Sequence, residues 1–300
     1  MRKFSIILFV FLFVYSCEIV VDLDVTPHES LLVVNSVINS SKDSLFAYVS
    51  YSQGSFDTGS VAYLNDAVVN IYEDNVFLGA MSYLSIPQNS NEFDLPTDTI
   101  YKYYLPYSPM AESLYSLQVS HPNYQDVEAH TLLPKTVPFS IDTLLVLGEM
   151  DYQSDIRLQL SFEDLEEENF YRLRVFTAKN QYNYYSQFET SDVSIVSNIG
   201  PGENSNFFGS DALFDDELFN GEKKTITLDF LVYGDSSSDH LLELSSISKD
   251  YFLYLRSLNL YFNNNNFSII PGEPVQVYSN IENGLGIMGS ISYNSVDINY

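Results

Sequence analysis

Alternating apolar and polar residues recur along most of this chain. The alternation is most regular in residues 67–71, 115–119, 155–163, 171–175 and 226–232. A period of two residues is typical of β-strands with one buried and one solvated face. Short strands separated by polar turns predict a mostly β protein, built as two antiparallel β-sandwich-like domains, rather than a parallel α/β fold.

The turns between these strands predict how they pair. Glu73-Asp74-Asn75 separates two apolar runs and predicts a hairpin. The acidic stretch 163–169 predicts a second hairpin, between the strands at 155–163 and 171–175. Residues 181–222 combine Gly-Pro-Gly, clustered acids and scattered aromatics, which predicts long loops.

One segment has a helical period. Tyr251, Phe252, Leu255 and Leu258 share one face at 3.6 residues per turn. Ser248 is a suitable N-cap, and the four asparagines at 263–266 are expected to end the helix. We therefore predict one amphipathic helix near 249–262, in the C-terminal domain, covering a sheet.

Two prolines, at 134 and 138, interrupt the strand pattern and predict a domain boundary. We expect an N-terminal sandwich over residues 31–135, similar to immunoglobulin or carboxypeptidase-regulatory domains. The second β-rich domain is expected over residues 136–300.

The N-terminus predicts export and lipidation. Arg2 and Lys3 precede a short apolar run, and the only cysteine of the chain, Cys17, follows it directly. Residues 1–16 therefore read as a lipoprotein signal peptide and 17–30 as a tether, with a diacylglycerol on the Cys17 thiol holding the protein to outer-membrane lipid. The alternative is an ordinary signal peptide with a chance cysteine.

The charge of the chain excludes several partners. Without Arg2 and Lys3, 11 of the 13 basic residues remain against 40 acidic ones, which gives a formal charge of −29. Nucleic acid and anionic lipid surfaces are therefore unsuitable electrostatic partners. With Cys17 acylated no disulfide is possible, so that stability must come from core burial.

Three stretches resemble one known family. Residues 279–287 read SNIENGLGI, residues 245–255 read SSISKDYFLYL and residues 215–221 read DDELFNG. They are similar to motifs of the Bacteroidota lipoproteins grouped as domain-of-unknown-function family 4249. The C-terminal motif includes Asn280, Asn283, Gly284 and Gly286. The resemblance implies an outer-membrane lipoprotein, often encoded near TonB-dependent receptors. It assigns no activity to the chain, because the family has none assigned.

The glycines at 284, 286 and 289 also match G-x-G-x-x-G, the dinucleotide-binding pattern. A nucleotide site needs a helix after the third glycine and an acidic residue about twenty positions later. Neither is expected in so short a remaining chain. We predict instead a strand that packs tightly against its neighbour.

Clustered acids raise the question of calcium. Asp211, Asp215, Asp216 and Glu217 lie within seven residues, and a second acidic group lies in 163–168. Carboxylates are suitable ligands for Ca²⁺. Neither group has the spacing of an EF-hand loop. The preferred interpretation, without any cofactor, is a solvated acidic loop in which some acids serve as turn or helix N-terminal residues.

Aromatic residues with polar neighbours gather at Tyr182, Tyr184, Tyr185 and Phe188. Exposed tyrosines suit a protein interface or a sugar-binding surface. The alternative is that these side chains belong to a core.

Together these patterns predict a lipid-anchored, non-catalytic outer-membrane accessory protein. It is expected to bind a partner barrel or TonB-dependent receptor in uptake or envelope assembly. The alternative is a surface glycan-binding protein or a weak glycan hydrolase. The leaflet that the protein faces is left open.

Overall fold

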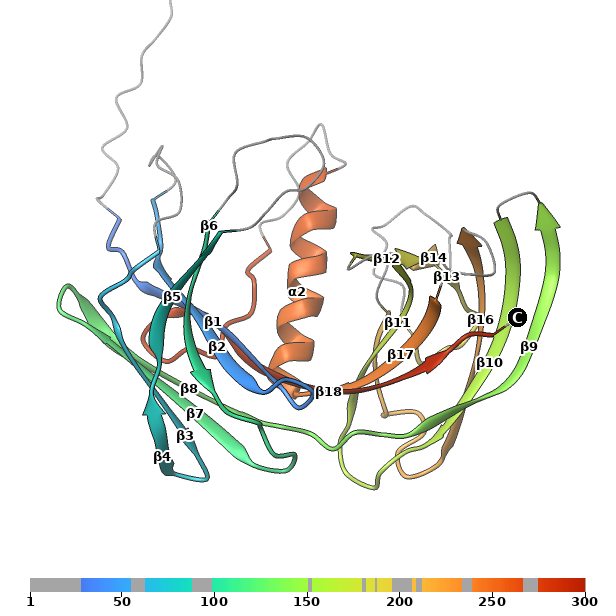
Figure 1. Ribbon diagram of the computed structural model, residues 1–300, viewed down its shortest axis with the longest axis horizontal. Helices are drawn as coiled ribbons and strands as arrows, with labels where there is room; N and C mark the ends of the chain where they lie inside the picture. Colours follow the sequence, from blue (N-terminus) through green and yellow to red (C-terminus); the bar gives the residue numbers. More distant parts are fainter. Residues whose placement is uncertain are drawn as a thin grey trace, which may run out of the picture.

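The computed structural model describes most of the chain after the predicted tether (Figure 1). The described residues are 28–54, 63–87, 99–150, 153–179, 182–186, 188–195, 207–208, 212–233, 239–266 and 275–299. Their strands form three sheets, of nine, five and four strands, and one long helix lies against the largest sheet. The prediction of a mostly β, sandwich-like protein with one helix is confirmed.

The N-terminal half is a sandwich of two sheets. One layer is part of the nine-stranded sheet and contains β1 (Leu32–Asn39), β2 (Ser44–Tyr51), β6 (Thr99–Pro106) and β5 (Ser82–Pro87). The other is the four-stranded sheet of β4 (Val76–Ala80), β3 (Val68–Glu73), β7 (Leu114–His121) and β8 (Tyr124–Leu132). Alternate residues of β1, such as Leu32 and Val34, are buried between the layers, as the period of two predicts.

The C-terminal half repeats this arrangement. Its part of the nine-stranded sheet contains β12 (Tyr182–Ser186), β11 (Phe170–Lys179), β17 (Asp239–Ile247) and β18 (Leu285–Asp297), with β15 (Ala212–Asp215) paired to β11. The facing sheet contains β14 (Phe207–Phe208), β13 (Phe188–Glu189), β16 (Lys223–Tyr233), β10 (Gln153–Glu163) and β9 (Phe139–Met150). A second core, rich in Phe and Leu, fills the space between them.

Strand β18 joins the two halves. It runs parallel to β1 and antiparallel to β17, so that one sheet crosses the whole molecule. Met288 of β18 contributes to the N-terminal core, and Val296, further along the same strand, packs against the C-terminal core. The segment after Leu132 connects the halves near the predicted boundary. Whether each half folds as an independent domain stays a prediction.

Helix α2 (Lys249–Asn266) begins where the sequence predicts. The Ser248 hydroxyl accepts a hydrogen bond from the Tyr251 N–H at 3.4 Å, as an N-cap does. The helix is longer than expected, because the asparagines at 263–266 form its last turn rather than its end. Low helix propensity is a weak signal beside the context of the folded chain.

The pairing predictions had mixed outcomes. The hairpin at Glu73-Asp74-Asn75 is confirmed as β3 and β4. The hairpin predicted across 163–169 is wrong, because β10 pairs with β9 and β16 in one sheet and β11 lies in the facing sheet. The long loop predicted over 181–222 contains short strands, β12 to β15.

Candidate interaction surfaces

The C-terminal family motif holds β18 in place. The Asn280 side chain donates a hydrogen bond to the Met288 carbonyl at 2.9 Å and accepts one from the Met288 N–H at 2.9 Å. It also reaches the His130 carbonyl of β8 at 3.3 Å. Asn283 has a positive φ of 60°, which asparagine tolerates better than most residues. The motif therefore has a structural role, because its hydrogen bonds connect β18 to the N-terminal half.

The glycines of this motif lie where no side chain fits. A Cβ on Gly284 would lie 2.8 Å from the Leu32 carbonyl oxygen, and one on Gly286 would lie 2.1 Å from the Val34 carbonyl oxygen. Gly289 approaches the Tyr251 ring of the helix, where a Cβ would come within 2.7 Å of the Tyr251 Cβ. The prediction that this strand packs tightly against its neighbour is confirmed.

The central motif forms a buried polar network rather than a solvated loop. Asp216 is buried and accepts a hydrogen bond from the Asn169 N–H at 2.7 Å. Asp164 is also buried; it accepts hydrogen bonds from the Tyr171 hydroxyl and from the Gly221 N–H, the latter at 2.9 Å. The motif thus fixes the crossing from β10 to β11, and the interpretation as a solvated acidic loop is wrong for these two acids.

The other acids of the predicted cluster do not join them. Asp215 is half-buried and accepts the Glu217 N–H at 3.3 Å, while Glu217 itself is exposed. Asp211 lies outside the described residues. Among the residues that the structure describes, no three His, Cys, Asp or Glu side chains converge as metal ligands. Calcium binding stays a prediction.

The buried network makes a prediction about pH. Burial, together with the negative charge of Asp164, raises the pKa of Asp216 above its ordinary range, although the Asn169 N–H lowers it. The folded protein then binds a proton at Asp216 more tightly than the unfolded chain does. The ionised carboxylate therefore costs stability at neutral pH, and this cost falls as the pH falls from the raised pKa towards the unfolded value of about 3.9.

We expect Asp216→Asn to keep the acceptor for the Asn169 N–H and to remain within about 1 kcal/mol of the wild type at neutral pH, whereas Asp216→Ala loses about 1–3 kcal/mol. As the pH falls from neutral to about 4, the free energy of unfolding of the wild type should rise relative to that of Asp216→Asn, because the cost of the ionised Asp216 carboxylate is lost. Urea unfolding at several pH values measures this. A difference that does not change with pH would contradict the raised pKa.

The four residues of the predicted aromatic surface lie on two different strands. Tyr182, Tyr184 and Tyr185 lie on β12, which pairs with β11 at one edge of the nine-stranded sheet. Phe188 is fully buried in the C-terminal core, so its prediction as a surface residue is wrong. Residues of a strand alternate between core and surface, and composition alone does not separate the two.

A groove lined by tyrosines lies on the N-terminal half. Its volume is about 600 Å³. Residues of β1, of β2 and of the segment directly after β2 line it together with Tyr63, which pairs with Ser50: Val33, Asn35, Tyr48, Ser50, Tyr51, Ser52, Gln53 and Tyr63. Tyr63 is exposed, and its ring lies 6.0 Å from that of Tyr101, which stacks on Tyr83 at 6.1 Å. Sequence analysis missed this group, because its members come from four separate segments.

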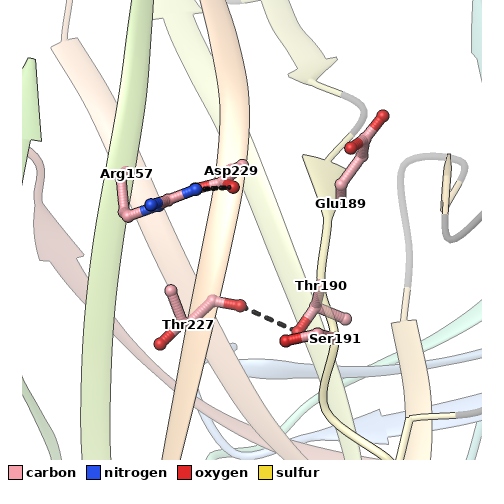
Figure 2. Close-up of a pocket in the computed structure, with 6 residues that line it drawn as sticks. All are labelled: Arg157, Glu189, Thr190, Ser191, Thr227 and Asp229. Carbon is pink, nitrogen blue, oxygen red and sulfur yellow. Dashed lines mark hydrogen bonds and ion pairs between the residues drawn. The ribbon is translucent and has the colours of Figure 1, made fainter. Parts of the chain in front are cut away.

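A second, polar groove of about 420 Å³ lies on the outer face of the five-stranded sheet. Arg157 makes a bidentate ion pair with Asp229 at 2.7 and 2.6 Å, and Thr190 donates a hydrogen bond to the Thr227 carbonyl at 2.8 Å. Figure 2 shows that the Glu189 carboxylate points away from this ion pair. Glu189 and Asp229 are cross-strand neighbours on β13 and β16, and the Asp229 carboxylate is held by Arg157.

The most unusual surface is the outer edge of β9. This strand has 12 residues and ends the five-stranded sheet, with β10 its only partner among the described strands. Leu145, Val146 and Leu147 are all exposed on it. An exposed, long and apolar edge strand offers unpaired backbone groups to another chain, and proteins usually protect such edges.

Strand β8 shows the usual protection. It ends the four-stranded sheet, and its exposed positions include Asp126, Glu128 and His130. Residues 280–282 also cover this edge, because the Glu282 N–H donates to the Glu128 carbonyl at 2.8 Å and Asn280 reaches the His130 carbonyl. On β9 the exposed Asp142 and Glu149 flank the uncharged run Leu145–Leu147, and the register with β10 shifts beside Leu147. No described strand covers the outer side of β9, so that of these two edges it is the one open to a further strand.

The anchor region lies outside the described residues, which begin at His28. Cys17 and its lipidation therefore stay predictions. In the part of the chain that is described, no helix has both the length and the hydropathy needed to cross a bilayer.

Comparison with known proteins gives a family and no function. A search of curated proteins finds no match to this chain. The model of the family described as "Domain of unknown function (DUF4249)" matches residues 18–296, nearly the whole chain and both halves of the fold. The chain therefore belongs to the DUF4249 family.

Proposed function

We propose that this protein is a lipid-anchored, non-catalytic accessory protein of the outer membrane that binds a partner barrel or receptor. The observation that carries the proposal is the apolar free edge of β9, with Leu145, Val146 and Leu147 exposed. Its process is uptake or envelope assembly, as the proximity of TonB-dependent receptors implied by the family resemblance suggests.

The mode of binding follows from the chemistry of a strand edge. An extended segment of the partner, such as a loop or a terminal arm, adds beside β9 and pairs with its free backbone groups. The exposed Leu and Val side chains supply apolar contact area and exclude water from the new pairs. A closed barrel has no free edge of its own, so the segment comes from outside its wall.

Lipidation at Cys17 increases the strength of such contacts. A tethered protein and its membrane partner meet at a high effective concentration, so that a modest edge contact is sufficient for a lasting complex. The acidic charge of the chain keeps it soluble and separates it from other acidic surfaces.

A lysine in the centre of β9 tests the binding edge. We expect Val146→Lys to reduce partner recovery about tenfold or more, because a charge buried beside an added strand costs at least about 1.4 kcal/mol. The matched control is Val193→Lys. Val193 is 81% exposed on a turn outside the strands and should not alter recovery, whereas Val146 is 41% exposed on β9.

Both variants are measured by quantitative mass spectrometry after mild-detergent purification from the native membrane. Equal recovery of a partner by the two variants would remove β9 from the binding surface. Thermal unfolding of each variant confirms that a loss of partner is not a loss of fold.

The tyrosine groove supports a second candidate, a surface glycan-binding protein. Tyr48, Tyr51 and Tyr63 stand among Asn35 and Ser50, and flat rings beside polar groups are suited to sugar binding. Binding to a glycan array in the absence of any protein partner would favour this candidate.

A further inference from the structure

The free end of helix α2 exposes three consecutive large apolar side chains. Leu260, Tyr261 and Phe262 are all exposed, whereas Phe252, near the start of the helix, is buried in a small core with Ile291 of β18. The helix thus packs against the sheet with its first turns only. Figure 1 shows it rising from the middle of the nine-stranded sheet, between the two halves of the molecule.

The base of the helix is firmly held. The Ser248 hydroxyl accepts the Ser290 N–H at 3.1 Å, and the Ser248 N–H donates to the Ser290 carbonyl at 3.0 Å. The Tyr278 hydroxyl donates to Asp250, and the Tyr278 N–H donates to the Ser257 hydroxyl at 2.8 Å. Burial and the Asp250 carboxylate raise the pKa of Tyr278 to about 12, so this hydroxyl stays a donor at neutral pH.

Because these hydrogen bonds hold the first half of α2, the apolar end of the helix has a fixed position relative to the sheet. With a rise of 1.5 Å per residue, Phe262 lies about 20 Å along the axis from Lys249. The helix therefore presents Leu260, Tyr261 and Phe262 well away from the sheet.

The charge around this end differs from that of the whole chain. Residues 251–266 contain no Asp or Glu and one basic residue, Arg256, in a chain whose formal charge is −27. The exposed Leu, Tyr and Phe are followed by four neutral asparagines. Apolar and aromatic groups with neutral polar neighbours match the chemistry of a bilayer interface, and residues 251–266 carry no acid that would repel lipid phosphates.

The position of the helix end is also consistent with contact with a bilayer. Figure 1 shows that the C-terminal end of α2 and the start of the described chain lie at the same rim, the upper one in this view. The residues from Cys17 to His28 span at most about 38 Å when fully extended. A lipid on Cys17 would therefore hold this rim within about 38 Å of the membrane.

We propose that the free end of α2, formed by Leu260, Tyr261 and Phe262, is a second membrane contact that enters the headgroup region of the bilayer. This inference goes beyond partner binding but depends on the lipid anchor of the proposed function. Together the two contacts would hold the same rim of the protein against the membrane.

The absence of tryptophan from this chain makes the contact directly measurable. In Phe262→Trp, the introduced indole is the only one in the protein. The matched control is Phe77→Trp on β4, at the opposite rim, because Phe77 is 55% exposed and Phe262 is 52% exposed. Both are made in the full chain, purified from membranes and reconstituted in zwitterionic phosphatidylcholine vesicles with brominated acyl chains.

We expect the emission of Phe262→Trp to shift to the blue and to lose about half its intensity to brominated lipid, as for an indole about 5–10 Å deep in the interface. Phe77→Trp should do neither. Equal emission and quenching in the two variants would overturn the inference. Protection of the Phe262→Trp indole only when a partner protein is added would also overturn it, since the helix end would then be a protein contact.

The intact mass of the purified chain separates this result from the proposed function. A mass without the diacylglycerol contradicts the lipid anchor itself. Absence of quenching of Phe262→Trp in protein that carries the diacylglycerol overturns the helix contact and leaves the anchor standing. A chain with neither the diacylglycerol nor quenching overturns both.

Discussion

Replacement of Gly286 by alanine is expected to destabilise the protein by about 4 kcal/mol, because two costs combine at this position. Gly286 has a φ of +111°, which side-chain-bearing residues rarely adopt, and its Cβ would lie 2.1 Å from the Val34 carbonyl oxygen. Either β1 or β18 must move, and this pair of strands joins the two halves of the molecule.

Gly148→Ala is the matched control for this prediction. A Cβ on Gly148 meets nothing within 4 Å, so that the substitution should change stability by less than about 1 kcal/mol. Denaturant and thermal unfolding of both variants measure the difference, and we expect Gly286→Ala to melt about 10 °C below the wild type. Similar stability of the two alanine variants would contradict the assigned role of the family motif.

Removal of Arg174 is expected to destabilise the protein by about 3–5 kcal/mol, the cost of leaving a buried carboxylate without its charged partner, with only the Ser245 hydroxyl still donating to it at 3.0 Å. Arg174 of β11 donates two hydrogen bonds to Glu243 of β17, at 3.0 and 2.6 Å, and the two side chains are only 15% and 5% exposed. Arg174→Met keeps much of the side-chain volume and removes the charge. The double variant with Glu243→Met should recover part of the loss.

The matched control is the pair of Arg157 with Asp229, in which the guanidinium also donates two hydrogen bonds to one carboxylate. It also spans neighbouring strands, but its side chains are 49% and 35% exposed. Arg157→Met should therefore cost no more than about 1 kcal/mol. Urea unfolding compares the two, and a cost for Arg174→Met as small as that for Arg157→Met would show that burial does not set the strength of this pair.

The sequence was informative where one local pattern determines one local structure. The period of two in β10 and β11, the turn between β3 and β4, and the Ser248 N-cap are all features of neighbouring residues. The three glycines at 284, 286 and 289 also carried a correct prediction, because close backbone approach is the common reason for such a cluster.

Features that depend on residues far apart in the sequence could not be predicted from local patterns. The period of two in β10 and β11 does not say which sheet each strand joins, so a crossing between sheets was taken for a hairpin. The burial of Asp164 and Asp216 depends on Tyr171 and on backbone groups at Asn169 and Gly221.

The two surfaces that support the proposals, the edge of β9 and the end of α2, have sequences that are more typical of buried elements. The run Leu144 to Leu147 is apolar, which normally predicts a buried strand, yet three of its residues are exposed at a sheet edge. The apolar residues of α2 predicted only a packing face, and only the first turns of the helix use it. Exposure of an apolar residue is a property of the whole fold.

The most direct test of the proposed function is purification of the tagged, lipidated wild-type chain from its native membrane in mild detergent, followed by mass spectrometry. The proposal predicts an outer-membrane barrel or receptor in stoichiometric amounts, recovered through β9. Recovery of no partner, together with binding of the same preparation to a glycan array, would contradict it and would assign the tyrosine groove as the working surface.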